Sequence, residues 1–516
     1  MINRGFLFIF LFPATLIAQK DSIAIRYSEL IKSDTMSKYL HVLASDAYEG
    51  RETGKKGQKM AASYISEQFK INGIPPFNAA GYYQPFSVET LRNSPIVSQK
   101  PTVSVNGRTF NSDKDYCLLQ GRTPLQLETK TILFLGYGIE ESTYNDYKNA
   151  SPENKVILIM EAEPFSKDSI SLVSGKKNLS EWSTFYKKKI ERAYKHGASA
   201  LFIVANDFEK DLETNKTKSP FIRLEKGRAE LPVFYISKEM ANSILKHHTV
   251  DKLKEKIQEK SEPIQKKVKA SLTISIINEA EKIASENVLG FIEGGDLKDE
   301  LLVISAHYDH LGKDGNAIYN GADDDGSGTS AILNIAKAFA VAKKQGHGPR
   351  RSVLCIAFSG EEKGLLGSDY YVEHPEYPLK NTVCDLNIDM IGRMDEKYKG
   401  NPNYIYLIGS DKLSSELHAI NERTNVTYCN LKLDYTYNDE LDKNRYYYRS
   451  DHYNFAKKGI PVIFYFNGVH EDYHKETDEV QKIDFKKMEK ITRLVFFTAW
   501  EIANRDKRIV VDSNKK

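Results

Sequence analysis

Short apolar runs alternate with amphipathic stretches over residues 280–505, and this alternation constrains the fold more than any other feature of the sequence. The apolar runs, which have the length and composition of strands buried on both faces, are Leu301–Ala306, Ser352–Phe358, Thr382–Asp389, Tyr404–Gly409 and Val462–Phe466. The stretches with helical spacing are Ser330–Gln345, Leu365–His374, Leu413–Arg423 and Phe485–Ala503. Strands of this kind with intervening helices predict an α/β fold, in which helices sandwich a mixed, mainly parallel sheet.

The composition excludes several classes of protein. The chain has 516 residues, of which 41% are hydrophobic and 28% charged, values that are ordinary for a soluble globular protein and argue against disorder or several membrane spans. Lys and Arg number 73 against 70 Asp and Glu, so the sequence lacks the strong basic excess of a nucleic-acid binder. We therefore expect no nucleic-acid partner.

The first residues have the three-part pattern of an export signal. Arg4 gives a positive start, an apolar run covers Phe6–Ile17, and Ala18 is a small residue suited to cleavage. The run is shorter than the roughly 20 apolar residues of a spanning helix, and Pro13 interrupts it. We predict a signal peptide over residues 1–18, a periplasmic or extracellular location, and no membrane span after cleavage.

The cysteines do not indicate a disulfide framework. An exported chain can form disulfides, but these four cysteines are widely spaced, and two lie in apolar, strand-like runs. They are Cys117, Cys355, Cys384 and Cys429. We expect buried thiols.

The remainder of the chain divides into three regions. Residues 19–94 are mostly helical in pattern and are expected to pack on the catalytic domain, which covers residues 276–516. Between them, residues 95–275 contain short β-rich runs and no cluster of metal-ligand residue types. The Lys- and Glu-rich stretch Lys252–Lys269 is typical of a solvated helix or a linker.

Histidines and carboxylates follow the predicted strands of the catalytic domain. In an open α/β sheet, ligands bind beyond the carboxyl ends of the strands. The segments found there are His307–His310, Asn320–Gly328, Ser359–Glu362, Asp389 and Gly468–Asp478. Each alone is typical of a solvated helix start or a capped turn, but their ordered occurrence after successive strands predicts a functional site.

Zinc chemistry accounts for these residue types. Zn²⁺ binds His nitrogen and carboxylate oxygen, and two such ions about 3.5–4 Å apart can share a carboxylate and a water. A carboxylate that is not a ligand must then accept the proton of the water. A metal-bound His also needs an acceptor for its other nitrogen, and Asp309 follows His307 by two residues.

Five motifs resemble those of the co-catalytic zinc exopeptidases, a family that includes bacterial leucyl aminopeptidases and glutamate carboxypeptidase. The motifs are AHYDH at 306–310, GADDDGSG at 321–328, SGEEKGLLGS at 359–368, NIDMIGR at 387–393 and DYHKETDE at 472–479. The stretch ASDAYEGRETG is similar to the leading segment of secreted members, and residues 95–275 resemble the β-rich protease-associated domain inserted in such enzymes.

The resemblance implies a role for each matching residue and two Zn²⁺ ions per chain. It implies that Asp324 bridges both ions, that His307 and Asp389 complete one and Glu362 and His474 the other, that Glu361 is the general base, that Asp309 orients His307, and that Tyr473 stabilises the oxyanion. It also implies a cis peptide bond between Asp324 and Asp325.

The favoured function is that of a secreted di-zinc aminopeptidase acting on peptides. A carboxypeptidase of the glutamate carboxypeptidase type is the main alternative, because the fold supports both. Glutaminyl cyclase uses a single zinc, and a receptor-like binding module would have lost ligands, so the full ligand set disfavours both. The sequence leaves open the substrate side chain and the oligomeric state, and Arg445–Arg449 is expected to be an ordinary aromatic strand rather than a substrate-lining segment.

Overall fold

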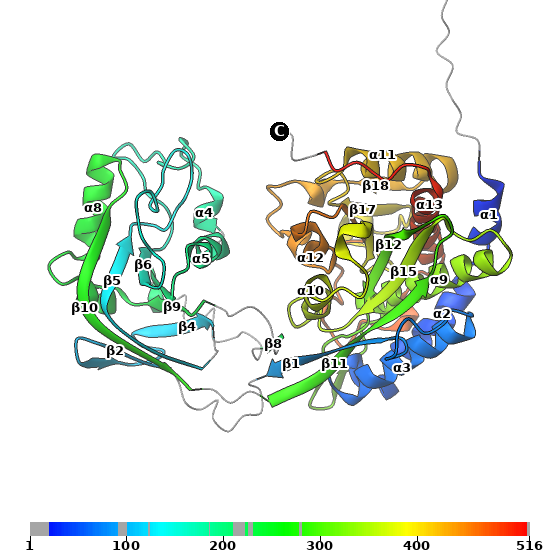
Figure 1. Cartoon of the computed structure of the whole chain (residues 1–516), viewed down its shortest axis with the longest axis horizontal. Coiled ribbons are helices and arrows are strands. Elements are labelled where there is room, and N and C mark those ends of the chain that lie inside the picture. The colour runs from blue at the N-terminus through cyan, green and yellow to red at the C-terminus, as the bar shows by residue number, and fades with distance from the viewer. Residues whose placement is uncertain are drawn as a thin grey trace, which may run out of the picture. The chain divides into compact units, whose positions relative to one another are not determined.

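The chain forms two compact units, which we describe separately. The computed structural model describes residues 20–90, 101–121, 124–184, 186–209, 222–224, 231–277 and 281–512 (Figure 1). The first unit consists of Met1–Val88 and Ile283–Lys516, and the second of Glu89–Lys282. The predicted signal peptide, residues 1–18, lies outside the described residues.

A mixed sheet forms the centre of the first unit, in the strand order β18-β17-β19-β16-β12-β15-β11-β1. The strands are β1 (Tyr83–Thr90), β11 (Glu281–Ile292), β12 (Leu297–His307), β15 (Arg351–Phe358), β16 (Thr382–Ile388), β17 (Tyr404–Ile408), β18 (Lys432–Asp434) and β19 (Val462–Phe466). β15, β12, β16 and β19 run parallel, with Ser305 of β12 opposite both Ile356 and Asn387. β11 and β17 are antiparallel to their neighbours β15 and β19. The predicted mixed, mainly parallel sheet is confirmed.

Helices cover both faces of this sheet (Figure 1). They are α1 (Ser22–Ser28), α2 (Ser33–Leu43), α3 (Lys56–Ile71), α9 (Gly328–Lys344), α10 (Leu366–Glu373), α11 (Ser415–Thr424), α12 (His452–Lys457) and α13 (Phe485–Asn504). Successive strand residues point to opposite faces, so Leu302 and Ile304 join the core beneath α9 and α13. Leu301 and Val303 join a second core with Tyr371 of α10 and with α12.

Short elements connect these strands and helices. They are the hairpin β13 (Gly312–Asp314) and β14 (Ala317–Tyr319), and single turns at Asp46–Arg51, Ala322–Ser327, Leu379–Asn381, Glu396–Tyr398, Asn425–Cys429, Thr436–Asn438, Tyr446–Tyr448 and Val480–Lys482. The aromatic strand expected at Arg445–Arg449 is wrong. Arg445 adopts a left-handed conformation (φ 55°), and the Tyr446 N–H donates to the Asp442 carboxylate (3.1 Å), so the segment turns instead of extending.

The second unit has its own sheet, in the order β3-β2-β10-β5-β6-β7-β9-β4, with β5, β6, β7 and β9 parallel. Its strands are β2 (Thr102–Val105), β3 (Arg108–Phe110), β4 (Tyr116–Gln120), β5 (Leu125–Leu135), β6 (Val156–Met160), β7 (Ala200–Val204), β9 (Val233–Ile236) and β10 (Gln265–Ile276), and β8 (Ile222–Leu224) is a further short strand. Its helices are α4 (Glu181–Thr184), α5 (Tyr186–Lys195), α7 (Lys238–Leu245) and α8 (Val250–Lys260).

The expectation for Lys252–Lys269 is wrong in its second half. α8 ends at Lys260, and β10 begins at Gln265. Val268 and Ala270 are buried while Lys267 and Lys269 between them are exposed, so the lysines occupy the solvent face of an amphipathic strand.

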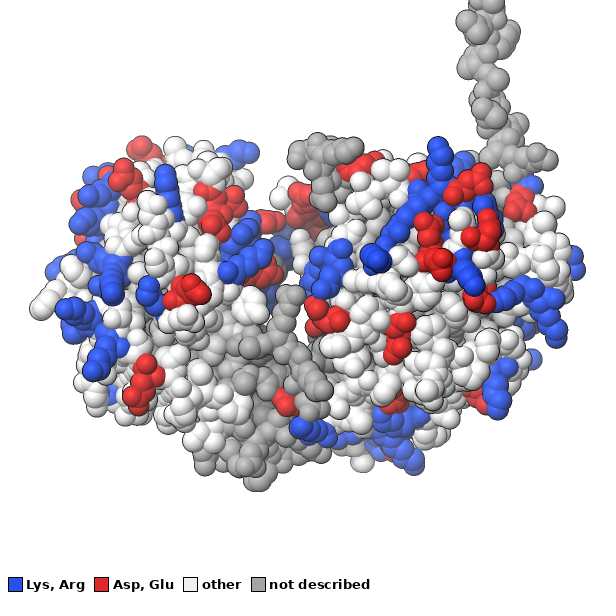
Figure 2. Space-filling view, viewed as in Figure 1, with Lys and Arg blue, Asp and Glu red and all other residues white. Residues whose placement is uncertain are grey.

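Charged residues of both signs are interspersed on the face shown in Figure 2, as the near balance of charge in the sequence leads one to expect. All four cysteines are buried, as predicted, and no disulfide joins them. Among the described residues, no helix has the length and apolarity needed to cross a bilayer.

Candidate metal centre

The carboxyl ends of the parallel strands bring the predicted ligands together. His307 is the last residue of β12, Glu361 and Glu362 follow β15, and Asp389 follows β16. Because these neighbouring strands run parallel, the residues beyond their ends meet at one edge of the sheet.

One group of donors consists of His307, Asp324 and Asp389. The Nε2 atom of His307 is 3.3 Å from Oδ1 of Asp324 and 3.6 Å from Oδ1 of Asp389. Two tetrahedral ligands, each about 2.0–2.2 Å from one zinc ion, lie about 3.4 Å apart, so these distances suit a shared ion. The other ring nitrogen, Nδ1, donates to the carbonyl oxygen of Asp309 (3.1 Å), which leaves the Nε2 lone pair for a metal.

A second group includes the other oxygen of Asp324. The Nε2 atom of His474 is 3.1 Å from Oδ2 of Asp324 and 3.3 Å from Oε2 of Glu362, again the spacing of ligands on one ion. Asp324 thus directs Oδ1 to the first group and Oδ2 to the second, which is the arrangement that a bridging carboxylate requires.

His310 also belongs to the second group, and sequence reasoning gave it no role. Its Nδ1 lies 2.8 Å from Oε1 of Glu362 and 3.9 Å from Oδ2 of Asp324. The ring is completely buried, and its Nε2 atom has no hydrogen-bond partner among the described residues. Its place as the last residue of the motif AHYDH was the available signal.

The concentration of buried negative charge at this site suits the binding of cations. Asp324 and Asp389 are buried, and the Glu361 and Glu362 side chains are only 10% and 6% exposed. Burial raises the pKa of Glu361 well above its usual range. Although burial disfavours a charged imidazole, nearby Glu361 and Asp389 raise the pKa of His307 well above its usual range. Divalent cations would neutralise this concentrated negative charge.

The two adjacent glutamates diverge. Glu362 faces His310 and His474, whereas Oε2 of Glu361 lies 3.9 Å from Nε2 of His307. Glu361 is in neither group of possible ligands. It is therefore placed beside the centre as a proton acceptor needs to be.

Asp309 contacts His307 through a different atom from the one expected. Its carbonyl oxygen, rather than its carboxylate, accepts the Nδ1–H of His307, and the nearer carboxylate oxygen is 3.9 Å away. The carboxylate instead accepts the hydroxyl of Thr53 (2.7 Å) and the N–H of Glu361 (3.2 Å). Asp309 thereby joins three segments of the chain.

Two further carboxylates shape the loop that carries Asp324, and sequence reasoning assigned neither. Asp478 accepts the Asp324 N–H (3.2 Å). Asp325 accepts the N–H groups of His307 (3.2 Å) and Met390 (3.1 Å) through different oxygens. The Asp324–Asp325 peptide bond is cis, as the resemblance implied.

Tyr473 lies next to His474, with the two rings stacked at a centroid distance of 3.9 Å. Its hydroxyl accepts a hydrogen bond from Nη2 of Arg449 (3.1 Å). Burial raises the pKa of Tyr473, so the hydroxyl keeps its proton at neutral pH and can donate it to a ligand oxygen.

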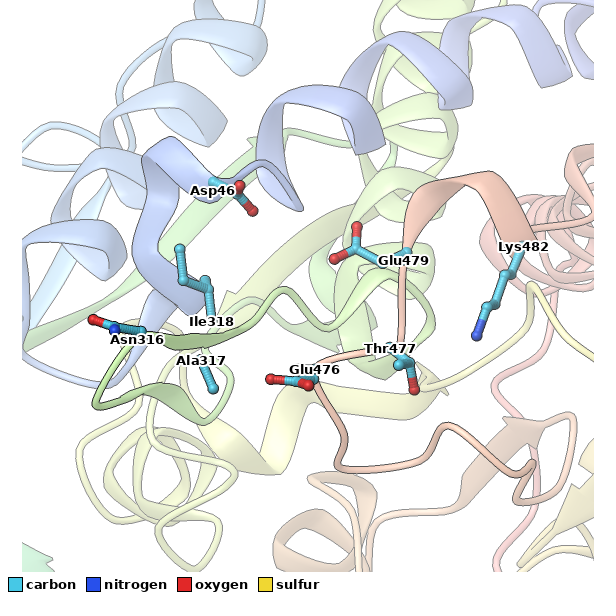
Figure 3. A pocket seen from close by; sticks show the side chains of 8 residues that line it. All are labelled: Asp46, Asn316, Ala317, Ile318, Glu476, Thr477, Glu479 and Lys482. Atoms are coloured by element: carbon cyan, nitrogen blue, oxygen red, sulfur yellow. The ribbon is translucent and has the colours of Figure 1, made fainter.

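An acidic hollow of about 400 Å³ lies over the segment that follows His474 (Figure 3). Its lining comes from the N-terminal turn, the β13–β14 hairpin and the C-terminal region, with Asp46, Asn316, Ala317, Ile318, Glu476, Thr477, Glu479 and Lys482. Asp46 and Glu479 both accept hydrogen bonds from Asn320, and Lys482 bonds to Asp472. Most of its charged groups are therefore already partnered within the protein.

Comparison with known proteins agrees with this geometry. The family model "Peptidase family M28" matches residues 287–499. The chain is 27% identical over 240 residues to Aminopeptidase YwaD of Bacillus subtilis (strain 168), a match that covers 43% of this chain and 46% of the relative. It is 34% identical over 119 residues to a probable glutamate carboxypeptidase, LAMP1, of Arabidopsis thaliana, covering 23% of this chain and 16% of the relative. The chain therefore spans less than half the length of each of these two relatives.

The fold is also similar to that of a solved structure, the aminopeptidase from Aneurinibacillus sp. strain AM-1. The two share 18% sequence identity with a TM-score of 0.50, over 95% of this chain and 98% of the other. This likeness concerns the fold, whereas the family match covers residues 287–499, a range that includes every predicted metal ligand. Residues 287–499 of this chain are therefore similar to peptidase family M28.

Proposed function

We propose that this protein is a zinc metallopeptidase that binds two Zn²⁺ ions and acts on peptides as an aminopeptidase. The observation that carries the proposal is the position of Asp324, whose two carboxylate oxygens face separate donor groups. His307, Asp324 and Asp389 would hold one ion, and Asp324, Glu362 and His474 the other. Zinc, when bound, supplies a Lewis acid for the substrate carbonyl and lowers the pKa of water.

The residues of the chain provide the proton transfers. Glu361, beside the first donor group, accepts the proton of the attacking water and returns it to the leaving amine. Tyr473, whose hydroxyl is held by Arg449, donates a hydrogen bond to the carbonyl oxygen as negative charge develops on it. Asp309 keeps the His307 ring in the tautomer that presents Nε2.

The similarity to Aminopeptidase YwaD supports cleavage from the amino terminus, and the similarity to LAMP1 supports a carboxypeptidase as the second candidate. Four versions of one peptide decide between them: free, N-acetylated, C-amidated, and blocked at both ends. An aminopeptidase cleaves the free and amidated forms and rejects both acetylated ones. Cleavage of the acetylated peptide with a free carboxylate would instead establish the carboxypeptidase, and Glu361→Gln is the matched inactive control.

We further propose that the chain is exported and that Glu89–Lys282 is a protease-associated domain. The charge and apolar pattern of residues 1–18 supports export, and the compact second unit at the predicted insertion point supports the domain. Mass spectrometry of the protein from its source would show a mature chain that begins near Gln19. An intact Met1 on the released protein would contradict the signal peptide.

A further inference from the structure

Arg51 connects the two loops that carry His307 and Asp324. It is 1% exposed, and its guanidinium donates four hydrogen bonds of 2.5 to 2.9 Å, all to backbone carbonyls. The acceptors are Leu43, Tyr308, Asn320 and Gly321. Tyr308 directly follows His307, and Gly321 lies three residues before Asp324. One side chain from the N-terminal region thus spans both ligand loops.

The backbone around Arg51 also packs closely against the segment that follows His307. Gly50 and Arg51 both adopt left-handed conformations, with φ of 64° and 52°. A side chain at Gly50 would come within 2.4 Å of the Gly312 carbonyl oxygen, so the turn packs directly against the segment after His310. The N–H of His310 also donates to the carbonyl oxygen of Arg51 (3.3 Å).

A second contact joins the same turn to the metal centre. The Thr53 hydroxyl donates to the carboxylate of Asp309 (2.7 Å), and the carbonyl of Asp309 fixes the ring of His307. The N-terminal turn therefore reaches His307 by two routes, one through Tyr308 and one through Asp309.

Only arginine can make the four-carbonyl contact. Its planar fork carries five N–H groups in fixed directions, whereas lysine offers a single ammonium and methionine offers none. Burial lowers the pKa of Arg51 to about 10, opposed by the charges of Asp309 and Asp324, so the side chain remains a cation at neutral pH. It places one positive charge beside the ligand loops in addition to its geometric role.

We propose that Arg51 is a positioning residue of the metal centre, which holds the His307 loop and the Asp324 loop at the separation that zinc binding needs. The proposal rests on the proposed function, since it concerns the donor group that contains His307 and Asp324. Arg51 supports this group from outside the region that the family model matches, residues 287–499. Arg51 itself touches neither substrate nor metal.

Arg351 provides a matched control within the same unit. It is also 1% exposed, and it also donates to backbone carbonyls, those of Ile502, Arg505 and Asp506. Unlike Arg51, it donates in addition to a carboxylate, that of Glu300. It is the first residue of β15, at the end of the strand opposite to Glu361 and Glu362. Loss of Arg351 should therefore affect folding stability as loss of Arg51 does, without affecting the ligand loops.

The test measures zinc affinity by chelator competition, below the unfolding temperature, for wild type, Arg51→Met and Arg351→Met. We expect Arg51→Met to bind zinc about 10- to 100-fold more weakly, the range for lost outer-shell support, and Arg351→Met to match wild type. The absorption spectrum of the cobalt-loaded Arg51→Met protein should also differ from that of wild type.

Equal zinc affinities in all three proteins would overturn the proposal, and so would equal losses in both variants. If wild type bound no zinc, the proposed function itself would fail, which is a distinct result. Should Arg51→Met not fold, Thr53→Val removes only the hydroxyl that reaches Asp309. We expect this variant to fold and to bind zinc more weakly than wild type, and wild-type affinity in it would count against the proposal.

Discussion

At the residue scale, Glu361 and Glu362 are neighbours in sequence but have different surroundings. Glu361→Gln keeps the size of the side chain and removes its ability to accept a proton. We expect kcat to fall by about 10²–10⁴-fold while zinc content stays at two ions per chain. Glu362→Gln replaces a charged ligand with a neutral amide, so we expect loss of one ion. Metal analysis and kinetics on both variants measure these effects.

The reverse pattern would show that the two roles are exchanged. If Glu361→Gln lost zinc while Glu362→Gln kept both ions, the base would be Glu362. Full activity in both variants would place the reaction elsewhere in the molecule.

Three of the predicted ligands could be expected to lie close together because each comes just after an apolar strand, whereas the roles of all five came from the family resemblance. His307, Glu362 and Asp389 need only the strand ends and the parallel order to be brought together. Arg51 could not be assigned in this way, since its contacts lie at Tyr308 and Gly321, more than 250 residues away, and are made to backbone atoms. Backbone acceptors are present at every residue, so no pattern in the sequence marks them.

At the scale of elements, burial on both faces made the strands of the first unit easy to recognise. β15, β16 and β19 contain only buried residues, and the predicted runs match them to within one residue at each end. The errors occurred where local polar groups or one-sided burial decided the conformation. The Asp442 carboxylate accepts a hydrogen bond from the Tyr446 N–H, so the aromatic segment forms a turn. In β10, Lys267 and Lys269 lie on the exposed face of the strand.

The helix α12 begins with a histidine that must stay neutral in the folded protein. His452 is completely buried and stacks on Phe464 of β19 at a centroid distance of 4.7 Å, and burial lowers its pKa to about 3. The unfolded chain takes up a proton near pH 6.5, whereas the folded protein does so only near pH 3. Stability from this residue is therefore complete above pH 6.5 and is lost as the pH falls.

We expect the free energy of unfolding of wild type to fall, relative to that of His452→Phe, by about 2 kcal/mol between pH 8 and pH 5. Urea unfolding of both proteins at the two pH values measures the difference, and groups common to both cancel. A constant difference between the two proteins would show that His452 takes up its proton equally in both states.

At the scale of the whole molecule, all candidate ligand groups among the described residues lie in the first unit. The second unit has its own sheet and its own buried cores, so we expect the first unit to fold without it. β1 and β11 are neighbours in the sheet, and the Leu289 N–H donates to the carbonyl of Tyr82, so the two ends of an excision lie on adjacent strands.

Replacement of Glu89–Lys282 by a short linker should leave a folded protein with two zinc ions and activity on small aminoacyl amides. Circular dichroism, metal analysis and kinetics on the excised protein check this expectation. A folded product that has lost zinc would show that the second unit contributes to the centre.

The most direct test of the central claim is a titration of the metal-free protein with Zn²⁺, in which hydrolysis of a peptide with a free amino terminus is measured at each step. We predict no hydrolysis without zinc, and a rate that rises until two equivalents are bound per chain and then stays level, because Asp324 joins two separate donor groups. Hydrolysis by the exhaustively chelated protein, or a maximum rate at one equivalent, would contradict the account.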